Sequence, residues 1–421
     1  MIAACGGGGG GAEPPVTPPP LIIDPPHVFT TFQHASAAIG QPNLESGEPN
    51  QGAQTSGRGL DFPQGMTLGP NGELLVADSD NKRVLVFQSV PVASGAMANA
   101  VFGQPDLDTS LIEISAQGLG GATGVAVGNG KIVIADKFAN RVLVYDQMAT
   151  PTFRPSAAVV IGQPDADSSA PGCAADGLNL PTSVAITPSG RLIVADSGNN
   201  RVLVWDAIPS DPDNVPPPTL VLGQGDFDHC VSNDDEPQDR VEDIGPDGQP
   251  LASARTLSSP KDIWSDDTRL VVVDSFNDRV LIWSSFPEAS FQPANLVLGH
   301  STFTDSMPNS EADGPGSDEP TARTLNIPGG VHSDGTSLVV ADTNNNRVLI
   351  WNAFPSQSFQ PADVVLGHRG FDQYASNDGN DDGIPDGATS QVFHLPQSVL
   401  LTSDALLVSD RGFNRVLVFR R

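Results

Sequence analysis

Hydrophobic runs alternate with short polar turns along this chain, and one pattern returns six times. In each copy an apolar run ends in Asp, and five residues later an Arg opens a second apolar run. The copies are LLVADSDNKRVLVF, IVIADKFANRVLVY, LIVADSGNNRVLVW, LVVVDSFNDRVLIW, LVVADTNNNRVLIW and LLVSDRGFNRVLVF. Runs of about five residues rich in Val, Leu and Ile, joined by a turn that often carries Asn or Gly, predict paired β-strands. This is a repeat protein, and the repeat predicts its fold.

Two further strands are expected to flank each pair. Upstream lie PQGMTL at 63, ATGVAV at 122, PTSVAI at 181, PKDIWS at 260, PGGVHS at 328 and PQSVLL at 396. Downstream lie short segments that end in Gly, namely VFG at 101, VIG at 160 and VLG at 221, 297 and 365. Continuous apolar runs need cover on both faces of their sheet. Four short antiparallel strands per unit, repeated radially, therefore predict an all-β, six-bladed β-propeller.

The two ends of the chain are expected to complete one blade. The last copy stops at Arg421 after its third strand, and AAIGQ at 37 is a fourth-strand sequence with no blade before it. We expect this N-terminal strand to complete the sixth blade. Such closure removes the free sheet edges of the ring.

The motifs P-x-G-V-x, L-x-V-A-D-S-x-N-N-R-V and V-x-G make residues 35 to 421 resemble the NHL-repeat family. The resemblance implies an NHL-like β-propeller over residues 27–421. It leaves the function open, because NHL-like propellers include protein-binding and nucleic-acid-binding modules as well as relatives of lyases and lactonases.

Residues 1–26 read as a tether, because a Gly run followed by a Pro-rich stretch gives a flexible and then a stiffer spacer. Ile2-Ala3-Ala4-Cys5 resembles the end of a bacterial lipoprotein signal, in which Cys5 becomes the lipid-modified residue. The alternative is coincidence, which leaves a plain linker. By family analogy, Gly6 after the Cys favours an outer-membrane lipoprotein that faces the periplasm or the cell surface.

The formal net charge of −29 argues against nucleic acid as a partner, and it argues against membrane contact other than through a lipid anchor. Much of the acid lies in the loops entering blades four to six, which begin at residues 226, 305 and 371. Because propeller connections of one kind emerge on one face, this charge is expected on one side of half the ring.

The repeated Asp and Arg are interpreted as structural, because a sixfold copy is what a structural device requires. Asp can accept turn N–H bonds, and Arg can pair with it or with the neighbouring blade. The aromatic residue that ends each third strand is interpreted as inter-blade packing. These aromatic residues are Phe87, Tyr145, Trp205, Trp283, Trp351 and Phe419.

Deviations between the copies give the candidate ligand site. Asp262 stands where other innermost strands carry Gly or Ser, and Trp264 and His332 replace Thr, Ala or Leu two residues further on. The three share strand parity on adjacent blades, so we expect them in the central channel as ligand candidates. One Asp and one His are too few ligands for a metal there, and no catalytic residues are assigned.

The loop Asp378-Gly-Asn380-Asp-Asp382-Gly-Ile-Pro-Asp386 resembles the calcium loops of thrombospondin type 3 repeats. Alternating carboxylate and amide oxygens with a Gly for the sharp turn suit a hard cation. The candidate calcium ligands are Asp378, Asn380, Asp382 and Asp386, and the alternative is a solvated acidic loop. No other cofactor is expected.

Cys173 and Cys230 follow the fourth strands of neighbouring blades, so a disulfide between adjacent loops is one interpretation and would fit an oxidising compartment. Two unpaired thiols are the other.

These observations support two functional hypotheses. The first is a non-enzymatic, lipid-anchored extracytoplasmic propeller that serves as a scaffold for a protein or glycan partner. The second is a propeller hydrolase or lyase, lactonase-like or amidating-lyase-like, with its site in the central channel near Asp262, Trp264 and His332.

Overall fold

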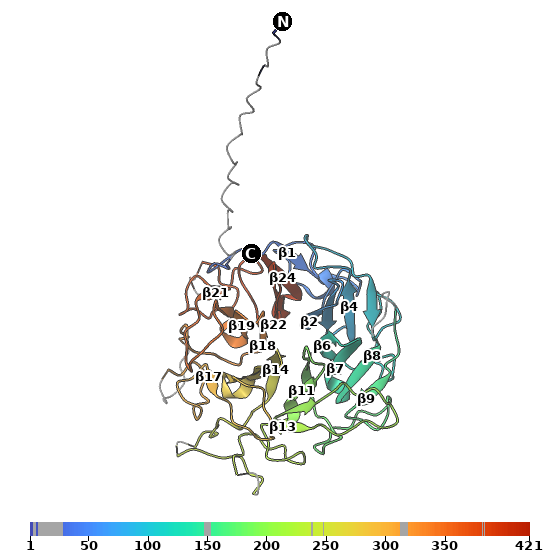
Figure 1. The fold of residues 1–421 in the computed structure, drawn as a ribbon, viewed down its shortest axis with the longest axis vertical. Helices are drawn as coiled ribbons and strands as arrows, with labels where there is room; N and C mark the ends of the chain where they lie inside the picture. The colour runs from blue at the N-terminus through green and yellow to red at the C-terminus, as the bar shows by residue number, and fades with distance from the viewer. Residues whose placement is uncertain are drawn as a thin grey trace.

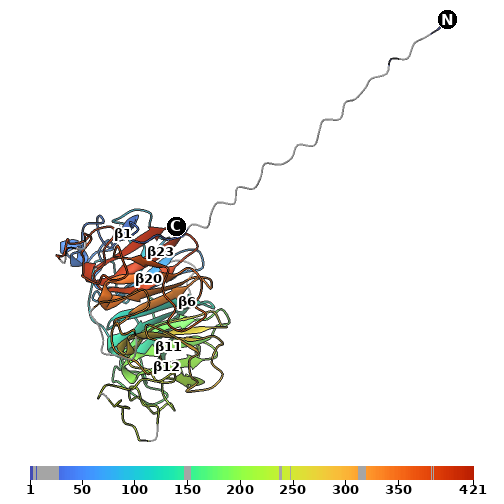
Figure 2. The same cartoon turned by 90° about the vertical axis from the view of Figure 1, so that its left-hand side faces the viewer.

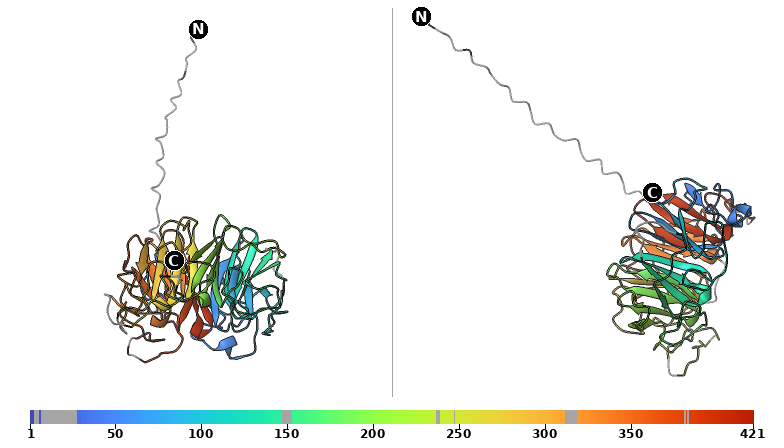
Figure 3. Two further views of the ribbon diagram at one scale, coloured as in Figure 1. Left: turned by 90° about the horizontal axis from the view of Figure 1, so that it is seen from below. Right: turned by 90° about the vertical axis from the view of Figure 1, so that its right-hand side faces the viewer.

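A computed structural model describes residues 1, 2, 6, 28–146, 153–236, 239–246, 248–311, 319–380, 382 and 384–421. Its strands form six four-stranded antiparallel sheets arranged radially around a central channel (Figure 1). Seen from the side, the ring is a thick disc with its strands running between the two faces (Figures 2 and 3). The prediction of an all-β, six-bladed propeller is confirmed.

The first three blades each run outward from the channel in chain order. Blade one holds β2 (Pro63–Leu68), β3 (Leu74–Asp78), β4 (Arg83–Phe87) and β5 (Ala100–Phe102). Blade two holds β6 (Ala122–Gly128), β7 (Lys131–Asp136), β8 (Arg141–Asp146) and β9 (Val159–Ile161). Blade three holds β10 (Pro181–Ile186), β11 (Leu192–Asp196), β12 (Arg201–Trp205) and β13 (Leu220–Leu222).

Blades four to six follow the same order. Blade four holds β14 (Pro260–Ser265), β15 (Leu270–Asp274), β16 (Arg279–Trp283) and β17 (Leu296–Leu298). Blade five holds β18 (Gly330–Ser333), β19 (Leu338–Asp342), β20 (Arg347–Trp351) and β21 (Val364–Leu366). Blade six holds β22 (Pro396–Leu401), β23 (Ala405–Asp410), β24 (Arg415–Arg420) and, from the N-terminal end, β1 (Ala37–Ile39).

Ring closure is formed by β1 and β24, which lie side by side in Figure 1. Ala37 is opposite Val418 and Ile39 is opposite Val416 in antiparallel register. The side chains of Ala37 and Ile39 are fully buried between blades six and one, and that of Ala38 is fully buried between blades six and five. The N-terminal strand therefore completes the sixth blade, as its sequence predicts.

The turn between the second and third strands is a short 3-10 helix in blades two to six. These helices are η2 (Lys137–Ala139), η3 (Ser197–Asn199), η4 (Ser275–Asn277), η5 (Thr343–Asn345) and η6 (Arg411–Phe413), and η1 (Pro49–Gly52) precedes blade one. Each of the five ends in a left-handed residue: Asn140, Asn200, Asp278, Asn346 or Asn414. Asn and Asp tolerate this conformation better than other non-Gly residues, which explains their recurrence. No helix in the described ranges is long and apolar enough to cross a membrane.

The hydrophobic core lies between blades, because both faces of every sheet are covered by the neighbouring sheets. One cluster joins blades three and four through residues such as Ile193, Leu270 and Trp283. The indole N–H of Trp283 donates to the carbonyl of Gln292 at 2.9 Å, so its polar atom is satisfied within the core. The aromatic residues that end the third strands therefore pack between blades, as expected.

Strand order fixes what each face of the ring carries. Pro63 pairs with Asp78 and Asp78 pairs with Arg83, so the start of a first strand lies beside the turn between the second and third strands. Val84 pairs with Phe102, which brings the end of the fourth strand to the same side. We call this side the loop face: it carries these turns and the connections from each fourth strand to the next blade. The acidic loops that begin at residues 226, 305 and 371 are such connections.

Candidate functional site at the channel mouth

The repeated Asp and Arg form a buried pair in every blade. In blade four, Arg279 Nε donates to Asp274 Oδ2 at 2.7 Å, and both side chains are fully buried. The remaining nitrogens of Arg279 donate to the carbonyls of Ser253, Thr256 and Phe303 in the flanking loops. Each Arg thus fixes loops of the loop face, which supports a structural role for the pair.

The repeat Asp also binds the turn that follows it, as expected: in blade four the side-chain amide of Asn277 donates to Asp274 Oδ2 at 2.8 Å. The other oxygen of each repeat Asp accepts a hydrogen bond from the loop that enters the first strand of the same blade. In blade four the donor is the N–H of Ser258, at 2.7 Å from Asp274 Oδ1. The carboxylate therefore ties the start of the first strand to the end of the second.

Asp262, Trp264 and His332 line one cavity of about 180 Å³ in the central channel. Asp262 bridges three blades: Oδ1 accepts from Ser183 Oγ at 2.6 Å and Oδ2 accepts from the N–H of Val331 at 2.9 Å. Burial raises the pKa of Asp262 to about 6, although these hydrogen bonds oppose the shift. This carboxyl group is therefore expected to change its charge near pH 6.

The other two candidates are also engaged with neighbouring blades. His332 Nδ1 accepts a hydrogen bond from the N–H of Leu401 at 3.3 Å, and burial lowers the pKa of His332 to about 4. The Trp264 ring lies 5.8 Å from that of Phe354, between ring centroids. The three residues thus share the channel and also join adjacent blades. Their role as ligand contacts stays a prediction.

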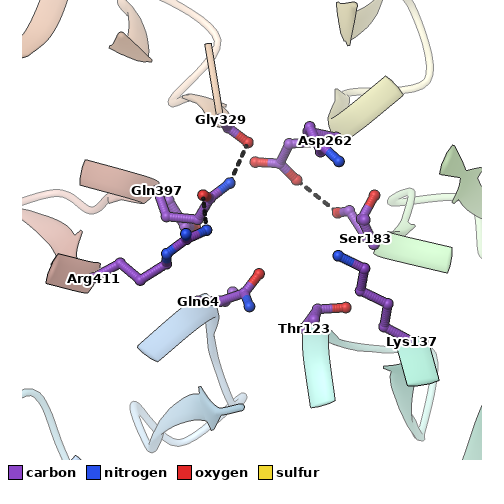
Figure 4. A pocket seen from close by; sticks show the side chains of 12 residues that line it. Gln64, Thr123, Lys137, Ser183, Asp262, Gly329, Gln397 and Arg411 are labelled. Carbon is purple, nitrogen blue, oxygen red and sulfur yellow. Dashed lines mark hydrogen bonds between the residues drawn. The ribbon is translucent and has the colours of Figure 1, made fainter. Parts of the chain in front are cut away.

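Above this cavity, at the loop face, a polar mouth of about 60 Å³ holds three basic side chains that the sequence analysis did not select. Lys137, Lys261 and Arg411 come from blades two, four and six, so every second blade supplies one cation. Figure 4 shows Lys137 and Arg411 reaching into the opening from different blades, with Asp262 on its wall. Further hydroxyl and amide groups in the lining come from Gln64, Thr123, Thr182, Ser183, Gln397 and Ser398.

The three cations are close enough to repel one another. Burial, together with the charges of Lys137 and Arg411, lowers the pKa of Lys261 to about 8. Burial and Arg411 also lower the pKa of Lys137. Among the described residues, no carboxylate lies within 4.0 Å of the charged nitrogens of these three side chains. The mouth therefore carries three cations against the one carboxyl group of Asp262 in its lining, within a strongly acidic protein.

Each of the three cations also contacts the face of an aromatic ring. The ammonium of Lys137 lies 5.5 Å from the ring centroid of Phe138, and that of Lys261 lies 5.4 Å from Phe276. The guanidinium of Arg411 lies 4.8 Å from the ring centroid of Phe62. A ring face attracts a cation without neutralising it, so these contacts position the charges and leave them available.

One signal in the sequence points to part of this cluster. Lys137 and Arg411 directly follow the repeat Asp, where the other copies carry Ser79, Ser197, Ser275 and Thr343. Lys261 occupies a different repeat position, the second residue of the first strand. A comparison of aligned copies therefore places Lys261 at a different repeat position from Lys137 and Arg411. Only the fold brings the three side chains together.

The candidate calcium loop is folded on itself through its carboxylates. Asp386 Oδ2 accepts from the N–H of Gly379 at 3.0 Å, and Asp378 Oδ1 accepts from the N–H of Asp382 at 3.2 Å. Within the described ranges, no group of three or more His, Cys, Asp or Glu residues is arranged to hold a metal. Residues 381 and 383 lie outside those ranges, and the calcium site stays a prediction.

The structure joins Cys173 and Cys230 by a disulfide between the connections that follow blades two and three, with the Cα atoms 6.2 Å apart. Arg201 donates to the carbonyl of Cys173, so the bridge is attached to the buried Asp–Arg pair of blade three. The candidate lipidation residue Cys5 lies outside the described residues.

Fold and site together define a six-bladed β-propeller with a polar, cationic channel mouth on its loop face. Two segments of the chain, residues 60–87 and 178–205, match the NHL repeat family model. They cover the first three strands of blades one and three, including the buried Asp–Arg pair. A comparison with curated protein sequences found no significant match.

Solved structures with a similar arrangement include a nutrient-binding protein and an enzyme. An auxiliary nutrient binding protein from Bacteroides ovatus is 11% identical at a TM-score of 0.45, covering 89% of this chain and 72% of that one. Kuenenia stuttgartiensis hydrazine synthase is 14% identical at a TM-score of 0.43, and the match covers 88% of this chain and 98% of that one. The computationally designed Ika8 protein is 9% identical at a TM-score of 0.41, and the match covers 92% of this chain and 100% of that one. Likeness at this level carries no information on function.

Proposed function

We propose that this propeller is a non-enzymatic binding scaffold that holds a protein or glycan partner on its loop face. The observation that carries the proposal is a pair of exposed aromatic side chains beside the channel mouth. Phe138 and Phe276 occupy the same position in the turns of blades two and four, and they are 55% and 59% exposed. Exposed aromatic side chains next to charged groups are typical of recognition surfaces.

Further exposed apolar side chains lie in the connections of the same face. They are Leu111, Ile112, Leu180, Val241, Ile244, Leu251, Tyr374 and Ile384. The backbone of these connections is tied down by the buried Arg side chains, so the surface is held in place before a partner arrives. Such preorganisation lowers the conformational entropy lost on binding.

The cellular setting belongs to the proposal as well. A lipid on Cys5 and the spacer over residues 6–26 would anchor the propeller to the outer membrane of a bacterium. The disulfide between Cys173 and Cys230 supports an oxidising compartment such as the periplasm or the cell surface. The NHL repeat matches favour a binding role but name no partner.

The binding face is tested by photo-crosslinking. A photoreactive amino acid at Phe138 or Phe276 of the full chain, expressed in a bacterium, is expected to give adducts. The same group at Asn71 provides the control, because Asn71 is exposed in the turn between β2 and β3, on the opposite face. Protease and glycosidase digestion of the adducts would separate a protein partner from a glycan. Equal adducts from both faces would contradict the proposal.

The anchor is tested separately. Replacing Cys5 by Ser is expected to release the protein from the membrane fraction, and mass spectrometry of the wild type is expected to find an acylated N-terminal peptide. A soluble wild type with an unmodified peptide would remove the anchor and leave the binding scaffold in place.

A further inference from the structure

The channel mouth concentrates positive charge in a protein whose formal net charge is −29. Several basic side chains outside the repeat Arg positions pair with carboxylates, as Lys131 does with Asp146 and Arg255 with Asp235. Lys137, Lys261 and Arg411 make no such pair among the described residues, and they converge on one opening whose lining holds the carboxyl of Asp262 among hydroxyls and amides. Three like charges held together against one counter-charge destabilise a protein. The arrangement therefore calls for an explanation outside folding.

We propose that Lys137, Lys261 and Arg411 form a binding site for one compact oxyanion, a phosphate or carboxylate group carried by a ligand. Cations from every second blade surround the mouth, so they reach a central group from three sides. This inference goes beyond the proposed scaffold function, since it requires neither the lipid anchor nor a macromolecular partner.

Arg411 gives a second observation that points to a ligand. One of its terminal nitrogens donates to Gln397 Oε1 at 3.0 Å, but its Nε is buried without a hydrogen-bond partner. A buried polar atom without a partner costs free energy that a bound acceptor would recover. An oxyanion accepts several N–H bonds at once, which matches the chemistry of two ammonium groups and a guanidinium.

The mouth also limits the size of the anion. Its volume of about 60 Å³ is several times the roughly 10–15 Å³ that one water requires, so a single small group fits. Beyond the mouth, the acidic connections of blades four to six would repel a longer polyanion. Because the Debye length is about 8 Å at physiological ionic strength, a small anion in the mouth interacts mainly with the three cations and with Asp262.

Titration of the mouth supports the assignment and sets its pH dependence. The ionisable groups that face the site are Lys137, Lys261, Arg411 and Asp262, with Asp80 near Arg411. The pKa of Asp262 is about 6 and that of Lys261 is about 8. Rising pH therefore adds a negative charge to the wall and then removes a positive one. Anion affinity is expected to be highest below pH 6 and to fall through pH 8.

The test is isothermal titration calorimetry of the full chain with inorganic phosphate and with glucuronate, at an ionic strength of about 0.15 M and pH 6. We expect the double variant Lys137→Gln/Lys261→Gln to lose about tenfold or more in affinity for the anion that binds. The control is Lys131→Gln, which removes a lysine from the opposite face, where it pairs with Asp146. Its affinity should equal that of the wild type. Thermal melts of each variant establish that the fold is retained.

The outcomes separate the alternatives. Binding of phosphate alone assigns a phosphate-bearing ligand, and binding of glucuronate alone assigns a carboxylate-bearing one. No measurable heat with either anion, or equal affinity in the wild type and the double variant, overturns the site. If polyphosphate binds with a higher affinity per site than phosphate does, the restriction to compact anions is overturned. None of these results depends on the photo-crosslinking of Phe138 and Phe276, so the two proposals fail independently.

Discussion

Asp278 Oδ1 accepts a hydrogen bond of 2.6 Å from the N–H of Ile327, across the joint between blades four and five. In blade five, Asn346 makes the equivalent bond to Leu395 and also donates from its amide to the carbonyl of Tyr374. An ionised Asp278 has no proton with which to donate. Among the five 3-10 turns of blades two to six, the left-handed residue is Asn in four and Asp in one, Asp278. The joint between blades four and five therefore has a carboxyl group where the others have an amide.

Asp278→Asn is therefore expected to stabilise the protein. Burial, with the charges of Asp342, Asp274 and Asp305, raises the pKa of Asp278 to about 7. An unfolded Asp titrates near 4, so the neutral native carboxyl contributes stability below about pH 4. That contribution is lost as the pH rises through 7. The amide of Asp278→Asn does not ionise, so its free energy of unfolding should exceed that of the wild type by on the order of 2 kcal/mol at pH 8.

Thermal melts at pH 5 and pH 8 check this prediction. The excess melting temperature of Asp278→Asn over the wild type should be larger at pH 8. The converse variant, Asn346→Asp, should lose stability with the same pH dependence. Equal melting temperatures of Asp278→Asn and the wild type at pH 8 would show that the carboxyl group is tolerated without cost.

Ring closure gives the second prediction. A chain that begins at residue 28 should unfold cooperatively, whereas one that begins at residue 60 should lose cooperative unfolding. The longer deletion removes β1, which pairs with β24 along its length, and it also removes Phe29 from the core beside blade six. An unpaired β24 would expose a sheet edge. Chemical denaturation followed by circular dichroism compares the two, and coincident transitions would reject the closure.

The third prediction concerns the buried pair of Asp274 and Arg279. Arg279→Met leaves Asp274 buried without its cation, so the free energy of unfolding should fall by about 3–5 kcal/mol. Adding Asp274→Asn should recover part of the loss, since the uncompensated charge is then gone. Urea denaturation measures both variants.

Arg420→Met is the control for this experiment, because Arg420 pairs with Asp404 at the surface. Removing such an exposed pair should change the free energy of unfolding by no more than about 1 kcal/mol. If Arg279→Met cost no more than Arg420→Met, the repeat pair would not be the structural device that its burial indicates.

The fold can be predicted from the sequence because the same strand–turn–strand pattern occurs six times. Each copy carries its own strand pair, its Asp and its Arg, so the six blades and the closing strand can be counted directly. The site is harder to predict, because its function rests on positions at which the copies differ. Asp262 and His332 stand out as single deviations and do lie in the channel.

Lys137, Lys261 and Arg411 come from two different repeat positions and from blades that are not neighbours. Their convergence depends on the radius of the ring and the direction of each side chain. Neither quantity can be obtained by comparing aligned copies, so the cationic mouth required the three-dimensional fold.

The last prediction concerns the candidate calcium loop. The loop offers the carboxylates of Asp378, Asp382 and Asp386 and the amide of Asn380 on an acidic face, where a divalent cation would offset their mutual repulsion. Since the folded state should bind best, millimolar calcium is expected to raise the stability by about 1–3 kcal/mol at ten to a hundred times the dissociation constant. Magnesium should do less, because it demands stricter octahedral geometry and gives up water reluctantly.

Thermal melts of Asp378→Ala/Asp382→Ala against the wild type decide whether the effect arises at this loop. The control is Asp226→Ala/Asp228→Ala, which removes two exposed carboxylates from another connection of the loop face, where Asp226 likewise accepts from the N–H of Asp228. Charge screening would act alike for calcium and magnesium and would survive both pairs of substitutions. Specific binding should be lost in the first double variant and kept in the second. A calcium response that persists unchanged in Asp378→Ala/Asp382→Ala would show that this loop is a solvated acidic surface.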